Sequence, residues 1–182
     1  MLVTILLLLP YFFAYIENRK GVILNDVVLN LIKPYDVSIP IFIVIWSTTL
    51  LFLIRSCYQP HIFVNGLYCL SFLCVVRMLT IYLVELDPPA TLIVIKDPLT
   101  SITYGGKDVF MTKDLFFSGH TSNMLMLALC FHNKSDKVIG YIATVLVGIL
   151  VLVQHAHYTI DVVAAFIITV FIVNFGKKVA AH

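Results

Sequence analysis

Long apolar runs, separated by shorter polar stretches, occupy most of the sequence. Six of these runs come close to the roughly 20 residues that an α-helix needs to cross the hydrocarbon core of a membrane. They cover approximately Leu2–Ile16, Val37–Ile54, Ile62–Val84, Leu115–Phe131, Val138–Val153 and Tyr158–Phe175. The pattern predicts an all-α, polytopic membrane protein, in which residues 1–182 form a single integral membrane domain, a six-transmembrane-helix bundle. The first run is short and contains Pro10, so the apolar core of a signal peptide is the competing interpretation there.

The composition supports a membrane protein and excludes some partners. Hydrophobic residues make up 60% of the chain and charged residues 12%, and the mean hydropathy is +1.00, whereas a soluble domain is about 45–50% apolar and about 25% charged. The formal net charge of +2 and the lack of any basic run longer than a pair argue against a nucleic-acid partner. The four cysteines are interpreted as small buried residues rather than as a disulfide framework.

The distribution of lysine and arginine predicts the orientation of the bundle. The short second and fourth connections and the C-terminal tail carry Arg55, Lys134, Lys137, Lys177 and Lys178. The long first and third connections carry, at lower density, Arg19, Lys20, Lys33, Lys96, Lys107 and Lys113. We therefore expect both termini in the cytoplasm and the long connections outside. In a bacterium, the membrane would be the plasma (inner) membrane.

Two histidines begin predicted helices at the face that this orientation makes extracytoplasmic. His120 begins the fourth segment, in "KDLFFSGHTSN", and His157 begins the sixth, in "HYTID". Asp161 follows His157 by four residues, so the carboxylate and the imidazole share one helix face. A carboxylate on one ring nitrogen fixes the tautomer and makes the other nitrogen a nucleophile. His120 is then placed to supply the matching general acid.

Two other interpretations remain open for histidines in this chain. Histidines near a membrane interface often only cap a helix or reach toward the head groups, and we accept this for His61, His132 and His182. A metal site is the other interpretation, with the candidate ligands His120, His155, His157 and Asp161. The spacing of His155 and His157 suits a strand more than one helix face, and no cysteine joins the cluster. We therefore expect no metal and no other cofactor.

Arg77 lies deep in the third segment, inside "VVRMLTIYLVELDPP". A guanidinium near the middle of the bilayer costs at least about 2.5 kcal/mol on insertion scales, so it needs an anionic partner. Glu85, two helical turns along, is one candidate partner. A bound phosphate is the other, because a planar fork of five donors suits it. Backbone N–H groups at Ser118 and Gly119, at a helix start, would point toward the same phosphate.

Four blocks of the sequence resemble those of a known family. "DLFFSGHT" and "HYTIDVVAAFIIT" resemble the two signature blocks of the sphingomyelin synthases, within the type 2 phosphatidic acid phosphatase superfamily. Arg77-x-x-Thr80-x-Tyr82, followed by "LDPP", is similar to the arginine-threonine-tyrosine block of that family, and "KPYDVSIPIF" is weakly similar to its proline-aspartate block. The resemblance covers about residues 33–175 and includes the six-span plan.

The resemblance implies a His-His-Asp triad that acts on a phosphorylated membrane lipid. His157 would attack phosphorus to form a phosphohistidine, Asp161 would orient His157, and His120 would protonate the departing lipid alcohol. The resemblance also implies substrate-binding roles, without a metal, for Arg77, Thr80, Tyr82, Asp114, Ser118, Gly119 and Tyr158. An acceptor such as ceramide or diacylglycerol would make the protein a transferase of a phosphocholine- or phosphoethanolamine-type head group. Water as the acceptor would make it a lipid phosphate phosphatase.

Departures from the family patterns favour the synthase branch. The phosphatase branch carries a serine-arginine pair at about the positions of Leu150 and Val151, and a proline at that of Phe117. The head group and the acceptor stay open. A non-catalytic lipid-binding or transport bundle is the third hypothesis. It would spread charged residues along the depth of several helices, whereas only Arg77 lies deep in this sequence.

Overall fold

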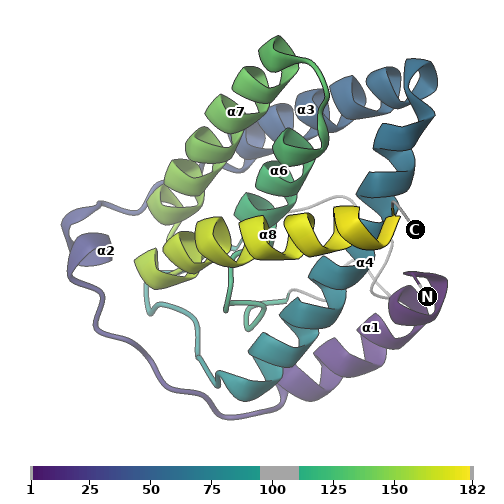
Figure 1. The fold of residues 1–182 in the computed structure, drawn as a ribbon. Coiled ribbons are helices and arrows are strands. Elements are labelled where there is room, and N and C mark those ends of the chain that lie inside the picture. The colour runs from purple at the N-terminus through teal and green to yellow at the C-terminus, as the bar shows by residue number, and fades with distance from the viewer. Residues whose placement is uncertain (1, 95–110, 181–182) are drawn as a thin grey trace.

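The computed structural model describes residues 2–94 and 111–180, and within these ranges every regular element is an α-helix (Figure 1). The helices are α1 (Leu2–Glu17), α2 (Val27–Leu31), α3 (Ser38–Tyr58), α4 (Pro60–Leu83), α6 (Gly119–Cys130), α7 (Lys134–Val153) and α8 (Thr159–Ala180). In the same ranges, β-type pairing is limited to one isolated parallel bridge between Val22 and Leu86. The predicted all-α class is confirmed. Lys96, Lys107 and His182 lie outside the described residues.

A helix lies on each of the six predicted segments, but the helices differ in length. Within the described ranges, α3, α4, α7 and α8 are long and apolar enough to cross a membrane, which fits an integral membrane protein. Helix α1 has 16 residues and α6 has 12. With a rise of 1.5 Å per residue, α6 is about 18 Å long, well short of the roughly 30 Å hydrocarbon core. The described part of the chain thus provides four helices of spanning length, where the apolar runs predicted six.

Helix α6 is short because it begins later than the apolar run. The predicted segment started at Leu115, but the helix starts at Gly119, after an N-cap at Ser118. The Ser118 side chain accepts the backbone N–H of Thr121, the contact by which serine starts a helix. The late start places the N-terminal turn of α6 inside the bundle.

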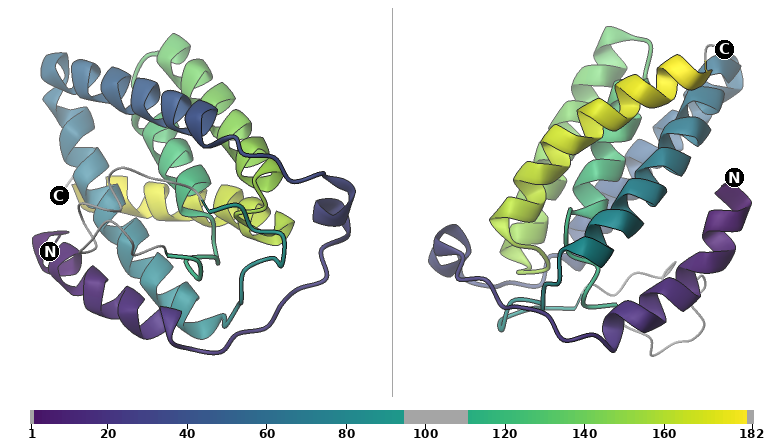
Figure 2. Two further views of the ribbon diagram at one scale, coloured as in Figure 1. Left: turned by 180° about the vertical axis from the view of Figure 1, so that it is seen from behind. Right: turned by 60° about the horizontal axis from the view of Figure 1, so that its bottom comes forward.

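Helix α6 lies at the centre of the bundle and contacts α7, α8, α4 and α3 (Figures 1 and 2). Nine of its twelve residues are buried. Because protein surrounds it, α6 carries hydroxyl and imidazole side chains that a lipid-facing helix could hold only at a cost. A Cβ atom at Gly140 of α7 would lie 2.7 Å from the Cβ atom of Ala128, so glycine allows the close packing of α7 on α6.

Helix α1 packs along the outside of α4 (Figure 2). Its buried residues recur every three or four positions, which places them on one face of the helix. This face packs with Ile81 of α4 and consists of Ile5, Leu9, Phe13 and Ile16.

The two ends of the bundle differ in their polar contacts. At the end formed by the α3–α4 and α6–α7 connections, Arg55 pairs with Asp136 at 2.8 Å, and Lys177 of α8 donates to the carbonyl oxygen of Leu129 at 2.6 Å. We call this the basic end, because it also carries Lys134. The opposite end contains the starts of α6 and α8, and we call it the site end.

Candidate active site

The first turn of α6 places His120 at the site end. The Ser118 hydroxyl donates to Oγ1 of Thr121 at 3.1 Å and accepts the N–H of Thr121 at 3.5 Å. This cap fixes the direction of the helix start, and His120 is the second residue of the helix. The His120 side chain is half-buried. The imidazole therefore has a defined backbone position and access from outside the core.

The turn between α7 and α8 carries His157, and the first turn of α8 carries Asp161. His157 is 4% exposed and Asp161 is fully buried. Nδ1 of His157 lies 3.5 Å from Oδ2 of Asp161, and the same oxygen accepts the N–H of Tyr158 at 2.9 Å. The contact between His157 and Asp161 is present, although His157 precedes α8 by two residues rather than beginning it.

Two buried polar atoms of this pair have no hydrogen-bond partner, namely Nδ1 of His157 and Oδ1 of Asp161. A buried polar group without a partner costs about 1–3 kcal/mol. Since Nδ1 already lies 3.5 Å from the carboxylate, a small rotation of either side chain joins the two. An Nδ1–H held by Asp161 leaves Nε2 of His157 as the nitrogen with the free electron pair.

The two histidine-bearing segments meet directly. The N–H of Ser118 donates to the carbonyl oxygen of Asp161 at 3.1 Å, so the expectation that this N–H points toward a phosphate is wrong. The ring centroids of His120 and His157 are 6.4 Å apart, with the ring planes at 64°. This separation allows both rings to reach one phosphoryl group placed between them, since proton transfer and attack need contacts of about 2.6–3.2 Å.

Arg77 of α4 reaches the same helix start. Its Nε donates to the carbonyl oxygen of Phe117 at 3.1 Å, and its Nη2 pairs with Oδ1 of Asp114 at 2.5 Å. A Cβ atom at Gly119 would lie 2.6–2.7 Å from three atoms of the guanidinium. The guanidinium therefore lies directly against Gly119, and a larger residue there would displace it. Arg77 thus adds a cation next to the residue that precedes His120.

Arg77 does not pair with Glu85, which the sequence offered as one of two candidate partners. Helix α4 ends before Glu85, and the Glu85 carboxylate pairs instead with Arg19 at 3.4 Å. The anionic partner of Arg77 is Asp114, from the segment that leads into α6. Asp114, predicted to bind substrate, therefore lies in the cluster as the partner of Arg77.

Thr80 joins the Arg77 cluster, whereas Tyr82 does not. The Thr80 hydroxyl lies 3.1 Å from the carbonyl oxygens of both Arg77 and Phe116. Tyr82 is five positions after Arg77 and points to a different face, since each residue turns a helix by about 100°. Its ring stacks on Tyr15 of α1 at 6.4 Å. The structure therefore does not bring Tyr82 to the cluster.

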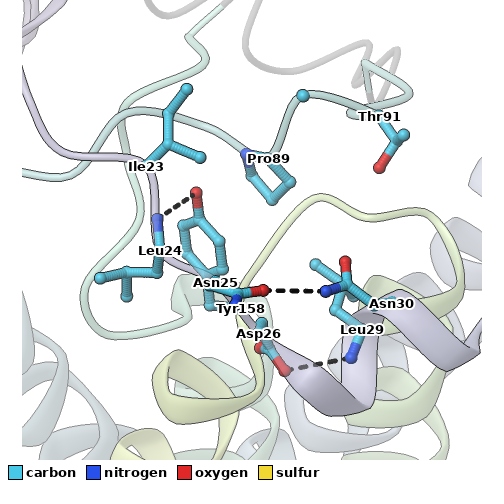
Figure 3. A pocket seen from close by; sticks show the side chains of 10 residues that line it. Ile23, Leu24, Asn25, Asp26, Leu29, Asn30, Pro89, Thr91 and Tyr158 are labelled. Carbon is cyan, nitrogen blue, oxygen red and sulfur yellow. Dashed lines mark hydrogen bonds between the residues drawn. The ribbon is translucent and has the colours of Figure 1, made fainter.

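Tyr158 lies next to His157 but its hydroxyl is engaged in structural contacts. The residue is 1% exposed, its hydroxyl donates to the carbonyl oxygen of Asp87 at 2.9 Å, and it accepts the N–H of Leu24 at 3.2 Å. Burial raises the pKa of this phenol. A cavity of about 320 Å³ lies beside it, between residues 23–30 and 89–91 (Figure 3). Neither His120 nor His157 lines this cavity, so it is separate from the histidine cluster.

Asp26 belongs to the site end and was not predicted from the sequence. Its carboxylate accepts the N–H and the hydroxyl of Thr159, the first residue of α8, at 2.6 and 3.1 Å. It also accepts the N–H groups of Val28 and Leu29 at the start of α2. Although burial acts to raise it, the hydrogen bonds from Leu29, Thr159 and Val28 hold the pKa of Asp26 below its ordinary value. The available signal was an aspartate directly before the apolar run "VVLNL", an N-cap pattern.

Gln154, at the end of α7, is a second residue that the sequence did not predict. Its Nε2 donates to the Ser38 hydroxyl at 2.7 Å, and its Oε1 accepts the N–H of Val37 at 3.2 Å. The side chain is fully buried. It therefore ties the start of α3 to the turn that carries His157.

The structure does not support the four-ligand metal site. In residues 2–94 and 111–180, no group of three or more His, Cys, Asp and Glu side chains is placed to hold a metal ion. His155 contacts the Thr91 hydroxyl with Nδ1 at 2.5 Å and the carbonyl oxygen of Ile32 with Nε2 at 2.9 Å. Both ring nitrogens of His155 thus hold neighbouring connections in place.

Comparison with known proteins is informative for the C-terminal part of the chain. Residues 112–178 match the family model described as PAP2 superfamily C-terminal. Neither the curated proteins nor the solved structures gave a match. The matched range includes α6, α7 and all but the last two residues of α8, and with them His120, His157 and Asp161. The match supports an assignment to the type 2 phosphatidic acid phosphatase superfamily, and with it a phosphatase or phosphotransferase function on lipids in general terms.

Proposed function

We propose that this protein is a membrane lipid phosphotransferase of the sphingomyelin-synthase type. It would move a phosphocholine- or phosphoethanolamine-type head group from a phospholipid to a lipid alcohol such as ceramide or diacylglycerol. The observation that carries the proposal is the meeting of two imidazole rings, 6.4 Å apart, with Asp161 3.5 Å from one of them. The guanidinium of Arg77 against Gly119 adds positive charge at the same place.

The same proposal includes a six-helix membrane bundle with the site end outside the cytoplasm. Helix α6 is enclosed by α3, α4, α7 and α8, so it completes the bundle without covering the full hydrocarbon thickness itself. Helix α1 packs on α4 as the outermost member. Arg55, Lys134 and Lys177 lie at the basic end, which supports a cytoplasmic location for that end.

In the first step, His157 acts as the nucleophile. Its Nε2 forms a bond to phosphorus while the bond from phosphorus to the lipid oxygen breaks. His120 donates its proton to that oxygen, so the lipid leaves as a neutral alcohol. Asp161 accepts the Nδ1–H of His157 and thereby stabilises the positive charge that develops on the ring. The product of this step is a phosphohistidine that carries the head group.

In the second step, the acceptor alcohol releases the head group. Its hydroxyl gives a proton to His120 while its oxygen bonds to phosphorus, and the bond between phosphorus and Nε2 breaks. The electron pair of that bond returns to Nε2 of His157. Both histidines end in the protonation states in which they began.

Arg77 is proposed to bind the phosphoryl oxygens during both steps. A guanidinium has five N–H donors in one plane, and the contacts to Phe117 and Asp114 do not exhaust them. Because the guanidinium is ionised, its hydrogen bonds to the phosphoryl oxygens become stronger as negative charge develops on those oxygens. The packing of Arg77 on Gly119 holds the fork at the start of α6, where backbone N–H groups add to the positive field.

A lipid phosphate phosphatase on the same three residues is the second candidate, with water as the acceptor. One feature of α7 favours the transferase. Val151 is fully buried and packs within the apolar core together with Leu150. These positions therefore supply no cationic group for the phosphate of a monoester, which carries more negative charge than a diester. A non-catalytic bundle is the third candidate.

The test is an assay of product identity. The purified protein in vesicles is incubated with head-group-labelled phosphatidylcholine or phosphatidylethanolamine, with and without ceramide, and in parallel with phosphatidic acid. The products are identified by mass spectrometry. We expect the labelled head group to appear on ceramide, as a phosphodiester, or on a second diacylglycerol. The variant Asp161→Asn should form neither product. Release of water-soluble phosphate from phosphatidic acid would instead establish the phosphatase. Lack of any turned-over lipid would favour the non-catalytic bundle.

A further inference from the structure

The connection between α1 and α3 exposes a large amount of apolar surface for a segment outside the long helices. Its exposed large apolar residues have exposed fractions of 48–83% and are Val22, Ile23, Val27, Val28, Leu31 and Tyr35. Leu31 is the most exposed of them, at 83%. Apolar side chains gathered on a surface in this way mark a region that contacts a partner or a membrane.

Helix α2, within this connection, has apolar residues on its inner and its outer side. Leu29 is 3% exposed and packs with Leu86, Leu115 and Tyr158. Leu31 and its neighbours on the outer side face away from this cluster. A surface helix in water would carry polar residues on that side, so the outer face of α2 is suited to an apolar environment.

Hydrogen bonds fix the segment at the level where two spanning helices end. At one end, Asp26 accepts the N–H of Thr159, the first residue of α8, at 2.6 Å. At the other, the N–H of Tyr35 donates to the carbonyl oxygen of Val153, the last residue of α7, at 3.0 Å. Both α7 and α8 are of spanning length, so a bilayer that these two helices cross would have its edge near these contacts. In all three views, α2 lies beside this end of α7 and α8 (Figures 1 and 2).

We propose that α2 and its flanking residues lie in the interfacial layer of the bilayer that holds the bundle. Val27, Val28 and Leu31 then contact lipid chains, as the apolar face of an interfacial helix does at a depth of about 5–10 Å. Tyr35 and Lys33 suit this position, because aromatic rings and lysine side chains are stable between the head groups and the chains. The occupant of this face is therefore lipid.

This membrane contact is coupled to the candidate active site through one residue. Asp26 caps both α2 and α8, and the start of α8 lies two residues after His157. The segment that rests on lipid is thus the same one that fixes the first turn of α8. The inference concerns the placement of α2 and does not depend on the chemistry proposed for the histidines.

The test measures the depth of α2 with a single tryptophan. The chain contains one tryptophan, Trp46 on α3, so Leu31→Trp in a Trp46→Phe background gives a single reporter. The protein is placed in phosphatidylcholine vesicles whose acyl chains carry bromine near the glycerol or near the chain end. We expect bromine near the glycerol to quench Trp fluorescence at position 31 more than deep bromine does, and aqueous acrylamide to have little effect.

Two controls keep the result interpretable. Lys20→Trp, at an exposed polar position of the same connection, should respond to acrylamide and not to brominated lipid. Val27→Trp is a second reporter on α2 in case Leu31→Trp does not insert. Quenching of both α2 reporters by acrylamide alone would overturn the proposal. The proposal would also be overturned if brominated lipid did not quench the tryptophan and its emission shifted to the blue as the protein-to-lipid ratio rose. That result would assign the outer face of α2 to contact with a second copy of the chain.

Discussion

Two pairs of histidines lie at opposite ends of the bundle, and their difference shows what prepares an imidazole for chemistry. At the site end, the rings of His120 and His157 are 6.4 Å apart. At the basic end, the rings of His61 and His132 are 5.8 Å apart. The pair at the basic end is the closer one, so distance between rings does not distinguish a candidate site.

The surroundings of the two pairs do distinguish them. His157 is 4% exposed and contacts the buried carboxylate of Asp161. His61 and His132 are both exposed, and the ion pairs of the described ranges join neither of them to a carboxylate. A buried ring with a carboxylate on one nitrogen has a fixed tautomer and orientation, whereas an exposed ring is solvated and free to change both.

The two arginine–aspartate pairs repeat the contrast. Arg55 and Asp136 join α3 to α7 at the basic end, at 2.8 Å. Arg77 and Asp114 pair at 2.5 Å beside Gly119, next to His120. The residue types are the same, and both guanidinium groups lie at a helix start, since Asp136 is in the first turn of α7. Only Arg77, however, lies beside a buried pair of imidazole and carboxylate groups.

The largest expected difference between the two histidine pairs comes from His157→Ala and His132→Ala. Loss of the nucleophile should lower the rate of head-group transfer by about 10³-fold or more, whereas His132→Ala should change it by less than about twofold. The transfer rate of a labelled phospholipid measures both, with thermal unfolding as the folding control. An equal loss in both variants would remove the distinction between the two pairs.

His120→Ala separates the roles within the site end. Turnover of a natural lipid should fall by about 10²–10⁴-fold, the usual contribution of a general acid–base group. A nitrophenyl phosphodiester needs little protonation of its leaving group, so His120→Ala should still give a burst of nitrophenol with this substrate. His157→Ala should give none. Loss of the burst in both variants would place His120 in a different role.

Arg77→Lys and Arg55→Lys test the two arginine pairs. Lysine keeps the charge but loses the planar fork. Loss of one hydrogen bond to a charged group, worth about 1.5–3 kcal/mol, should lower the transfer rate by about 10–100-fold in Arg77→Lys. Arg55→Lys should change stability and leave the rate within about twofold. A larger loss of rate in Arg55→Lys would contradict the assignment of the phosphate contact to Arg77.

The smallest expected effect concerns Asp26 and depends on pH. Because the pKa of Asp26 in the folded protein lies below its ordinary value of 3.8, the ionised carboxylate stabilises the fold above that pH. This contribution is lost as the pH falls through the lower, folded-state pKa. Asp26→Asn should lower the Tm by about 2–4 °C near neutral pH, as expected for a weakened cap, and the difference from wild type should shrink below about pH 4. A difference that grows on acidification would be inconsistent with an ionised cap.

The long helices and the three central residues of the site could be predicted from the sequence. Runs of apolar residues predict spanning helices directly, because in lipid the backbone N–H and C=O groups of a segment must hydrogen-bond to one another. His120, His157 and Asp161 were singled out as candidates because their motifs and a spacing of four residues are local features, and their catalytic role stays a prediction. The late start of α6 was missed, because the apolar run already begins at Leu115, whereas the Ser118 cap sets the first residue of the helix at Gly119.

The contacts that surround the site could not be predicted in the same way. Asp114 was expected to bind substrate, and its pairing with Arg77 depends on how α4 packs beside the segment before α6. The contact of Gln154 with Ser38 likewise joins residues 116 positions apart. Local propensity and periodicity carry no information on such pairs. Tyr82 shows the opposite error, since its place in a motif suggested a site residue while its ring packs on Tyr15.

The central claim is that His157, and not His120, becomes covalently attached to phosphorus. The direct measurement is rapid quenching of the protein with a labelled phosphodiester substrate, followed by peptide mass spectrometry under alkaline conditions. We expect a label on residue 157 that is stable in base and labile in acid, as a phosphoramidate is, and absent in His157→Ala. A label on His120 would reverse the two roles, and the lack of any covalent label during turnover would contradict the phosphohistidine mechanism.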